Sequence, residues 1–424
     1  MTDEPMAAGA SRRRSWVRRR AGVAALVAVV GPGLLAGLSD DDPAGITTYS
    51  VLGARYGYQL LWVLLLSTVA LVLFHDLASR MGVVTGQGLI GLVRQRFGVR
   101  TATAALAVLL VANIGTTAAE FAGIAAGFEL FGVSRYLSVP LAAIGVSTLV
   151  LRGSFHRVEH VLLALGSIFA AYILAGFLAH PDWSAAAKGL TWPSMPLERG
   201  ALFIAVATVG TTLAPWGLSF IQSYAVDKKL TVADLRYERV DVVLGATLTG
   251  VIGLFVVVAC AATLHASNIA VDSAADAARA LEPLAGSFAS GLFGIGLIGA
   301  ALLAASVLPL SSAYSICEFV GTDDAIDDRF REARLFYVAY AVVTAMGVAI
   351  VLVPGAPLIA ILVVSQAINA ILLLPLLALM GRMARDPDLM GEHRAGNAAS
   401  AVYLLAIGFI SLCIGTLGVL AVTT

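Results

Sequence analysis

The sequence predicts an all-α, polytopic membrane protein with eleven transmembrane helices, and three observations support this prediction. Hydrophobic residues make up 59% of the 424 residues and charged residues 13%, against roughly 45–50% and 25% in soluble domains. Apolar stretches of about 20 residues, the length that crosses about 30 Å of hydrocarbon, recur along the chain. Basic residues gather on alternate sides of these stretches, as the positive-inside rule requires.

The apolar stretches account for almost the whole chain. Their expected bounds are 22–56, 58–79, 101–130, 137–151, 158–179, 201–226, 240–264, 285–315, 335–353, 357–380 and 398–422. The corresponding organisation is a basic cytoplasmic tail (1–21), a first five-helix repeat (22–179), an extracellular loop (180–200), a second five-helix repeat (201–380), a cytoplasmic loop (381–397) and an eleventh helix (398–424).

Two apolar stretches are interrupted by the same pattern, Asp42-Pro43-Ala44-Gly45 within 39–45 and Ala214-Pro215-Trp216-Gly217 within 212–217. Proline removes a backbone donor, and a glycine two residues later tolerates unusual backbone angles, so both helices should unwind at mid-membrane. Irregular backbone at that depth is tolerated only where it is buried in protein or lines a cavity, and its freed carbonyls can bind a cation. The two interruptions therefore predict a binding site.

The distance between the interruptions predicts an internal repeat. Pro43 and Pro215 are 172 residues apart, and each lies in the first of five consecutive spans. An odd number of helices per repeat gives the second repeat the opposite topology, which is how many secondary transporters are built. The eleventh span is then an appendage.

Orientation follows from the positive charges. With the N-terminus in the cytoplasm, 22 of the 27 Lys and Arg residues lie in inside segments and five lie outside. The C-terminus is then extracellular, in a cell (inner) membrane. The arginines of the N-terminal tail, 12–14 and 18–20, are better explained by this topology than by a secretory signal, because no small-residue cleavage site follows them. The lipid bilayer is the expected partner, zero net charge gives no indication of nucleic-acid binding, and a monomer is compatible with the sequence.

Ordered motifs resemble a known family. Gly31-Pro32-Gly33-Leu34 leading into Asp42-Pro43-Ala44-Gly45 is similar to the first helix of the NRAMP divalent-metal transporters, whose break reads Asp-Pro-Gly-Asn. Further matches in the family's order are Leu61 to Thr68, Thr85-Gly86, Ala119-Glu120, Pro181-Asp182-Trp183, Gly189-Leu190, Ser365-Gln366 and Leu389 to Glu392. The resemblance implies a LeuT-type inverted 5+5 repeat with helices 1 and 6 broken, and transport of divalent cations by alternating access.

The resemblance also identifies a metal site that departs from the family's pattern. Asp42 matches the metal-binding carboxylate, and an ionised Asp at mid-membrane costs at least ~2.5–3.5 kcal/mol unless a cation or water compensates it. Gly45 stands where the family has asparagine, so one oxygen ligand is lost. Ala214 and Trp216 flank Pro215 where the family has Met-Pro-His, so the soft thioether ligand is also lost.

The remaining donors are oxygens, which favours Mg²⁺. Mg²⁺ prefers octahedral oxygen coordination and keeps several waters, whereas sulfur selects softer transition metals. The same substitutions are similar to those of the NRAMP-related magnesium transporters, so we expect transport of partly hydrated Mg²⁺ and of Mn²⁺, with no resident cofactor. Alternatives are a proton-coupled Mn²⁺/Fe²⁺ importer of the usual NRAMP type and a sodium-coupled amine or amino-acid carrier. An enzyme is not expected, because the spans hold no nucleophile with a paired base.

Proton coupling is not expected either, because most of the family's proton relay is missing. By resemblance, Thr117 replaces an aspartate of the relay, Trp216 replaces a histidine, and residues 335–352 hold no arginine, while Glu120 is retained. His75 and His156 lie near the ends of predicted spans, where a lone histidine is usually solvated.

The sequence thus defines three groups of candidate residues. The expected metal site is Asp42, Gln366, Ser39, Thr211, Gly45 and Ala214, the vestibule is Asp40, Asp41, Trp216, Glu120 and Thr117, and the helix breaks are Pro43, Gly45, Pro215 and Gly217. Three assignments keep a structural alternative. Gln366 can simply bond a neighbouring helix, Asp40 and Asp41 can cap or solvate the unwound segment, and Trp216 can be a gate or a filler.

Overall fold

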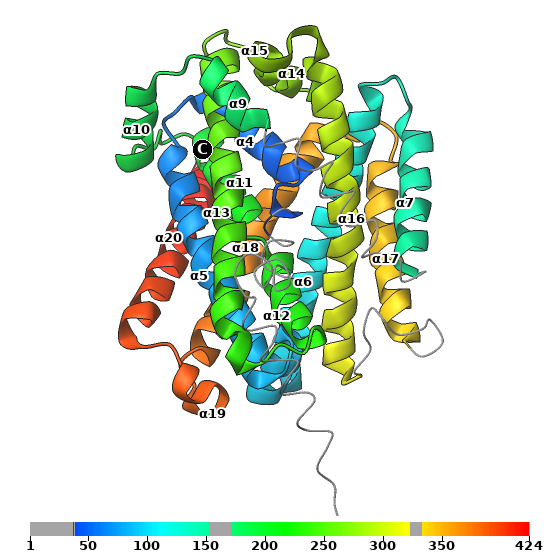
Figure 1. Ribbon diagram of the computed structural model, residues 1–424, viewed down its shortest axis with the longest axis vertical. Coiled ribbons are helices and arrows are strands. Elements are labelled where there is room, and N and C mark those ends of the chain that lie inside the picture. Colours follow the sequence, from blue (N-terminus) through cyan, green and yellow to red (C-terminus); the bar gives the residue numbers. More distant parts are fainter. Residues whose placement is uncertain (1–36, 38, 152–170, 323–332, 424) are drawn as a thin grey trace, which may run out of the picture.

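The predicted all-α membrane class is confirmed by a computed structural model that describes residues 37, 39–151, 171–322 and 333–423. Within these residues the regular structure is helical, and eight helices are long and apolar enough to cross a membrane. Most of them run along the long axis of the molecule as one bundle (Figure 1). Short helices cover the two ends of this bundle.

The first repeat contributes five of the helices that the structure describes. They are α4 (Pro43–Tyr56), α5 (Leu61–Thr85), α6 (Leu89–Glu129), α7 (Arg135–Leu151) and α9 (Ala171–Leu178). α6 begins at Leu89, twelve residues before the predicted span, which starts at residue 101. The additional residues form a helical segment that precedes a bend at Gly98, whose φ of 83° is outside the helical range. The first part of span 1 and most of span 5 lie outside the described residues.

The second repeat follows the same order. It comprises α11 (Arg199–Thr212), α12 (Pro215–Asp227), α13 (Leu235–Cys260), α16 (Ala289–Val320), α17 (Arg334–Val351) and α18 (Leu358–Met383), and α20 (Asn397–Thr423) is the appended eleventh helix. A π-helical turn, η3 (Ala261–His265), extends α13. At the upper end of Figure 1 lie α10 (Trp183–Thr191), α14 (Ala274–Ala278) and α15 (Glu282–Ala285), and at the lower end lies α19 (Pro387–Met390).

Both helix breaks occur where the sequence predicts them. Asp42 has extended backbone (φ −77°, ψ 169°) and is followed by Pro43 as the first residue of α4. Ala214 has nearly the same conformation (φ −83°, ψ 144°) and is followed by Pro215 as the first residue of α12. Proline suits this position because the first helical residue needs no intrahelical N–H donor. The pattern that interrupts each span therefore also starts its second half.

Glycines let the first break pack closely against its neighbours. Gly37 lies directly on the backbone of Gly245 in α13, and a Cβ on Gly123 of α6 would overlap the ring of Pro43. Such close approach of small residues replaces hydrophobic burial as the driving force for helix packing in lipid. Between the breaks, the hydroxyl groups of Tyr49 in α4 and Thr212 in α11 share a hydrogen bond of 2.9 Å. The two breaks are therefore adjacent.

Hydrogen bonds join α12 to α16 along its length. Ser311 donates to the carbonyl of Trp216 (3.1 Å), and the hydroxyls of Ser219 and Ser315 are 2.8 Å apart. Nearer the lower end, Ser223 donates to the carboxyl group of Glu318, and Tyr314 donates to Asp227 (2.9 Å). We refer to these four contacts as the α12–α16 seam.

Glu318 continues the seam to a third helix. Its carboxyl group accepts a hydrogen bond from the backbone N–H of Ile90 (3.0 Å) in the first turn of α6. Gly88, the N-cap residue of α6, has no side chain that could cap the helix, and a Cβ there would overlap Glu318. A carboxylate from a distant helix thus satisfies a donor that a local cap would normally satisfy.

Candidate cation site

Asp42 occupies the N-terminus of α4, where its carboxylate caps the helix. Oδ1 accepts a hydrogen bond of 2.5 Å from the backbone N–H of Gly45, and the side chain is only 4% exposed. The positive end of the helix dipole favours a negative charge here. The carboxyl group of Asp42 also interacts with that of Glu120 in α6. Gly123, which lies against Pro43, allows this approach between α4 and α6.

Oxygens from both breaks surround Gly45. The position that a Cβ on Gly45 would take is 3.0 Å from the carbonyl oxygen of Asp40, 3.2 Å from Oδ1 of Asp42 and 3.3 Å from Oγ1 of Thr211. The hydroxyl of Thr211 has no hydrogen-bonding partner among the residues that the structure describes. We call this group of three oxygens the Gly45 cluster. A carboxylate, a carbonyl and a hydroxyl are the donors that hard cations such as Mg²⁺, Ca²⁺ and Mn²⁺ accept.

The surroundings of the Gly45 cluster hold three buried carboxyl groups that have no hydrogen-bonding partner among the described residues. Asp40 and Asp41 are 2% and 3% exposed, and within the part of the chain that the structure describes no oxygen of either side chain has a hydrogen-bonding partner. Glu120 is fully buried, and its oxygens lack a partner of normal hydrogen-bond geometry despite the nearby Asp42. Uncompensated buried carboxylates are costly, and in a membrane they mark ion pathways. A divalent cation would provide the missing charge.

Gln366 is buried in α18, and its hydrogen bonds lead to α6. Its amide nitrogen donates to Ser365 (3.1 Å), and its amide oxygen accepts from Asn369 (2.9 Å). Asn369 in turn donates to Thr116 of α6 (2.9 Å). The contacts of Gln366 thus correspond to the structural alternative noted above, although its oxygen keeps one lone pair for a ligand.

The other predicted residues are buried around the two breaks in different roles. Ser39 is 1% exposed with an unpartnered hydroxyl, and Ala214 is 2% exposed at the N-terminus of α12. Trp216 is 1% exposed and packs with its ring centroid 6.2 Å from that of Phe220. Thr117 directs its methyl group at Gly347 of α17. Trp216 therefore lies in the packed interior, and Thr117 faces a helix that carries neither break.

The expectation that His75 is a solvated residue at a span end is wrong. α5 continues to Thr85, beyond the predicted end at 79, so His75 lies well inside the helix and is 1% exposed. Its Nε2 is 3.2 Å from the position that a Cβ on Gly217 would take. The predicted span ended too early, at residue 79, and this made His75 look like a residue near the end of the helix. His156, the other histidine of that expectation, lies outside the described residues.

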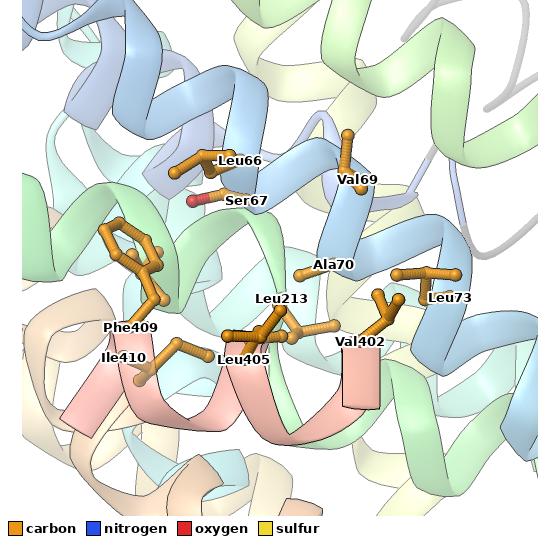
Figure 2. A pocket seen from close by; sticks show the side chains of 12 residues that line it. Leu66, Ser67, Val69, Ala70, Leu73, Leu213, Val402, Leu405, Phe409 and Ile410 are labelled. Carbon is orange, nitrogen blue, oxygen red and sulfur yellow. The ribbon is translucent and has the colours of Figure 1, made fainter. Parts of the chain in front are cut away.

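Among the described residues, two of the cavities adjoin the helices that carry the breaks. One lies between the C-terminal part of α4 and the N-terminal parts of α11 and α18, and is lined by Arg55, Phe203 and Pro357, together with Asp272. The other, shown in Figure 2, lies between α5, α11 and α20, and eleven of its twelve lining residues are apolar. Its one polar residue, Ser67, uses its hydroxyl to donate to the carbonyl of Val63. The cavity of Figure 2 therefore offers hydrocarbon contact and is not a cation site.

Helices broken in pairs at mid-bundle, in two repeats of opposite topology, define a membrane transporter of the LeuT type. Solved structures agree with this fold. An Eremococcus coleocola manganese transporter in complex with an aromatic bis-isothiourea substituted compound has a TM-score of 0.76 at 19% identity, covering 92% of this chain and 85% of that one. MhsT in complex with L-phenylalanine has a TM-score of 0.58 at 15% identity, covering 92% and 97%.

Sequence comparison narrows the class to one family. Residues 33–420 match the Natural resistance-associated macrophage protein-like (Nramp) family. The chain is 30% identical over 390 residues to the divalent metal cation transporter MntH of Burkholderia ambifaria, covering 88% of this chain and 85% of that protein. A second MntH, from Aeromonas hydrophila, is 28% identical and covers 90% and 93%. The chain therefore belongs to the Nramp family.

Proposed function

We propose that this protein is a secondary transporter of divalent metal cations that works by alternating access. It favours partly hydrated Mg²⁺ together with Mn²⁺ and does not couple their movement to protons. The observation that carries the proposal is the Gly45 cluster, in which oxygens from both breaks meet beside uncompensated buried carboxylates. The relatives named as divalent metal cation transporters support the class of cargo. They do not distinguish Mg²⁺ from Mn²⁺.

The preference for Mg²⁺ is argued from what surrounds the cluster. Ala214 and Gly45 replace the two side chains with which, by resemblance, the family contacts a transition metal. Without sulfur the site loses its advantage for soft ions. The donors that remain are oxygens, which suit an ion that prefers oxygen ligands and dehydrates reluctantly.

Transport without protons is energetically sufficient for uptake. A membrane potential of 100 mV, negative inside, favours entry of a divalent cation by about 4.6 kcal/mol, twice the value for a single charge. We place the protein in the cell membrane with the N-terminus cytoplasmic and the C-terminus extracellular. The C-terminal end of α20 lies toward the same end of the bundle as α10 and α14 (Figure 1), next to segments with few basic residues.

A proton-coupled importer of Mn²⁺ or Fe²⁺ is the second candidate, and two observations favour it. Glu120 is retained beside Asp42, and His75 is a buried titratable group near the second break. These residues could move a proton by a route different from the usual one of the family.

The test is uptake into proteoliposomes, with Mg²⁺, Mn²⁺, Ca²⁺ and Cd²⁺ offered in parallel and internal pH recorded. We expect Mg²⁺ and Mn²⁺ to enter without acidification and Cd²⁺ to gain no advantage over Mg²⁺. Acidification that follows Mn²⁺ entry would establish the second candidate instead. Failure of every divalent ion to enter would overturn the proposed class of cargo.

A further inference from the structure

A second group of buried polar atoms lies beside the second break, away from the Gly45 cluster. A Cβ on Gly217 of α12 would be 3.2 Å from Nε2 of His75 and 3.8 Å from Oδ1 of Asp40. The imidazole of α5 and the carboxylate of the first break therefore both lie close to Gly217, where a side chain would crowd the imidazole. We call the region between these two groups, beside Gly217, the Gly217 point.

Neither side chain has a hydrogen-bonding partner among residues 37, 39–151, 171–322 and 333–423 that would explain its burial. Both ring nitrogens of His75 and both carboxylate oxygens of Asp40 lack hydrogen bonds to any described residue, and the two residues are 1% and 2% exposed. A buried histidine normally bonds through at least one nitrogen, and a buried carboxylate through several bonds. Two unsatisfied groups that both lie beside Gly217 point to a ligand that they share.

Asp40 connects this point to the cation site already described. Its carbonyl oxygen belongs to the Gly45 cluster, whereas its carboxylate faces the Gly217 point. α12 and the second half of α5 run from the breaks toward the lower end of the bundle (Figure 1). The Gly217 point therefore lies on the side of the Gly45 cluster toward which an imported ion would leave.

We propose that His75 and Asp40 form a second, inner cation site at the Gly217 point, which receives the ion from the Gly45 cluster and favours Mn²⁺ over Mg²⁺. This inference rests on the proposed function. Imidazole nitrogen suits borderline transition metals and is a poor ligand for Mg²⁺, so one nitrogen donor changes the preference of an otherwise all-oxygen path. The carboxylate of Asp40 supplies the charge, and retained waters complete the coordination.

The experiment counts Mn²⁺ bound to the purified full-length protein and detects nitrogen coordination by pulsed electron paramagnetic resonance. We expect two Mn²⁺ per chain, one of them coupled to an imidazole nitrogen. His75→Gln should remove the nitrogen coupling and one bound Mn²⁺, because glutamine keeps the size and polarity but lacks the ring nitrogen. The matched control is His180→Gln, at an exposed histidine between α9 and α10, which should change neither measurement.

Asp40→Asn provides a second variant that keeps the imidazole. It should weaken Mn²⁺ binding at the inner site at least tenfold, because the carboxylate that faces the Gly217 point loses its charge. A single Mn²⁺ per wild-type chain, or nitrogen coupling that survives in His75→Gln, would overturn the inner site.

Asp42→Asn separates this inference from the proposed function. It should abolish uptake while the nitrogen-coupled Mn²⁺ remains, since the inner site does not use Asp42. If uptake persisted in Asp42→Asn, the proposed central site would be wrong, and the nitrogen coupling would still decide whether His75 binds metal. Loss of the coupling in Asp42→Asn would show that one site accounts for both observations and would overturn the second.

Discussion

The two helix breaks have nearly the same backbone and opposite chemistry. In each, an extended residue precedes a proline that starts a new helix, with ψ of 169° at Asp42 and 144° at Ala214. The first break carries three consecutive carboxylates, and Asp42 caps its own helix. The second break carries an alanine that caps nothing and a tryptophan packed into the interior. The first break therefore supplies carboxylates, whereas the side chains beside the proline of the second break supply only apolar packing.

This difference shows that a duplicated architecture does not need duplicated ligands. Proline fixes the geometry in both repeats, because it determines where the hydrogen-bonded ladder stops. In the proposed function, selectivity depends on the side chains beside the proline, which differ between the repeats while the backbone is nearly the same. In this chain the second break contributes the hydroxyl of Thr211 to the Gly45 cluster and leaves the charge to the first.

The largest effect should come from removing the charge of the first break. Asp42→Asn keeps a side-chain oxygen that can cap α4, so the fold should persist while uptake of Mg²⁺ and Mn²⁺ falls at least about tenfold, equivalent to 1.4 kcal/mol of binding. Uptake in proteoliposomes measures this. Asp182→Asn is the matched control, because Asp182 also caps a helix, through the N–H of Ala185, but is exposed. If Asp42→Asn took up ions as fast as the control Asp182→Asn, Asp42 would act only as a helix cap.

The next effect tests whether the first break depends on its close packing. Gly123→Ala places a methyl group against Pro43, which should cost about 1–3 kcal/mol as overpacking and lower the melting temperature. Uptake should fall as well, because Asp42 is displaced from Glu120. Gly115→Ala, in the same helix, meets nothing closer than 4.0 Å and should behave like the wild type. Full stability in Gly123→Ala would contradict this prediction, because it would mean that Pro43 moves away from the added methyl group at no cost in free energy.

A third change gives both breaks the ligands that the resemblance assigns to transition-metal transporters. Gly45→Asn together with Ala214→Met should shift the preference toward Mn²⁺ and Cd²⁺ over Mg²⁺ by about tenfold, or about 1.4 kcal/mol, since a thioether favours softer ions. Competition between these ions during uptake measures the shift. Gly45→Ala adds the same Cβ without a ligand, and it should reduce uptake of all ions alike. An unchanged preference in the double variant would mean that the two positions do not face the ion.

The smallest effect concerns the hydrogen bond between the breaks. Tyr49→Phe removes the bond to Thr212, whose hydroxyl still donates to Thr208. Hydrogen bonds between membrane helices are worth about 0.6 kcal/mol on average, so we expect a small decrease in melting temperature and nearly normal uptake. Tyr237→Phe, at an exposed tyrosine, serves as the control. A large loss of uptake in Tyr49→Phe alone would indicate that the bond holds the breaks in register.

The parts of the fold that depend on local chemistry could be predicted from the sequence. Pro43 and Pro215 start helices where expected, because proline acts on its own turn. The length of α5 could not be predicted, since its later residues are buried by contacts with other helices and not by lipid. That error misplaced His75. The link from Glu318 to the first turn of α6 was missed for a related reason, because more than two hundred residues separate the partners.

The neighbours of the two breaks could be predicted from the sequence in part, and whether they form a cation site stays a prediction. Asp42 and Thr211 meet at Gly45, as the paired breaks suggested. The hydrogen bonds of Gln366 run to Ser365 and Asn369, and no feature of the sequence distinguishes a glutamine that bonds its neighbours from one that binds an ion. Such a choice depends on side-chain directions between helices, which hydropathy and spacing do not specify.

The α12–α16 seam has a consequence for how easily these two helices can separate. Serine hydroxyls exchange a protein partner for water at little net cost, whereas interlocked apolar side chains would have to open a void. If water enters along the seam, Ser219, Ser223 and Ser315 each find a replacement partner at once. Without water, the hydrogen bonds of the seam hold α12 in line with α16. When water enters, it replaces these bonds, so hydration can control whether the two helices separate.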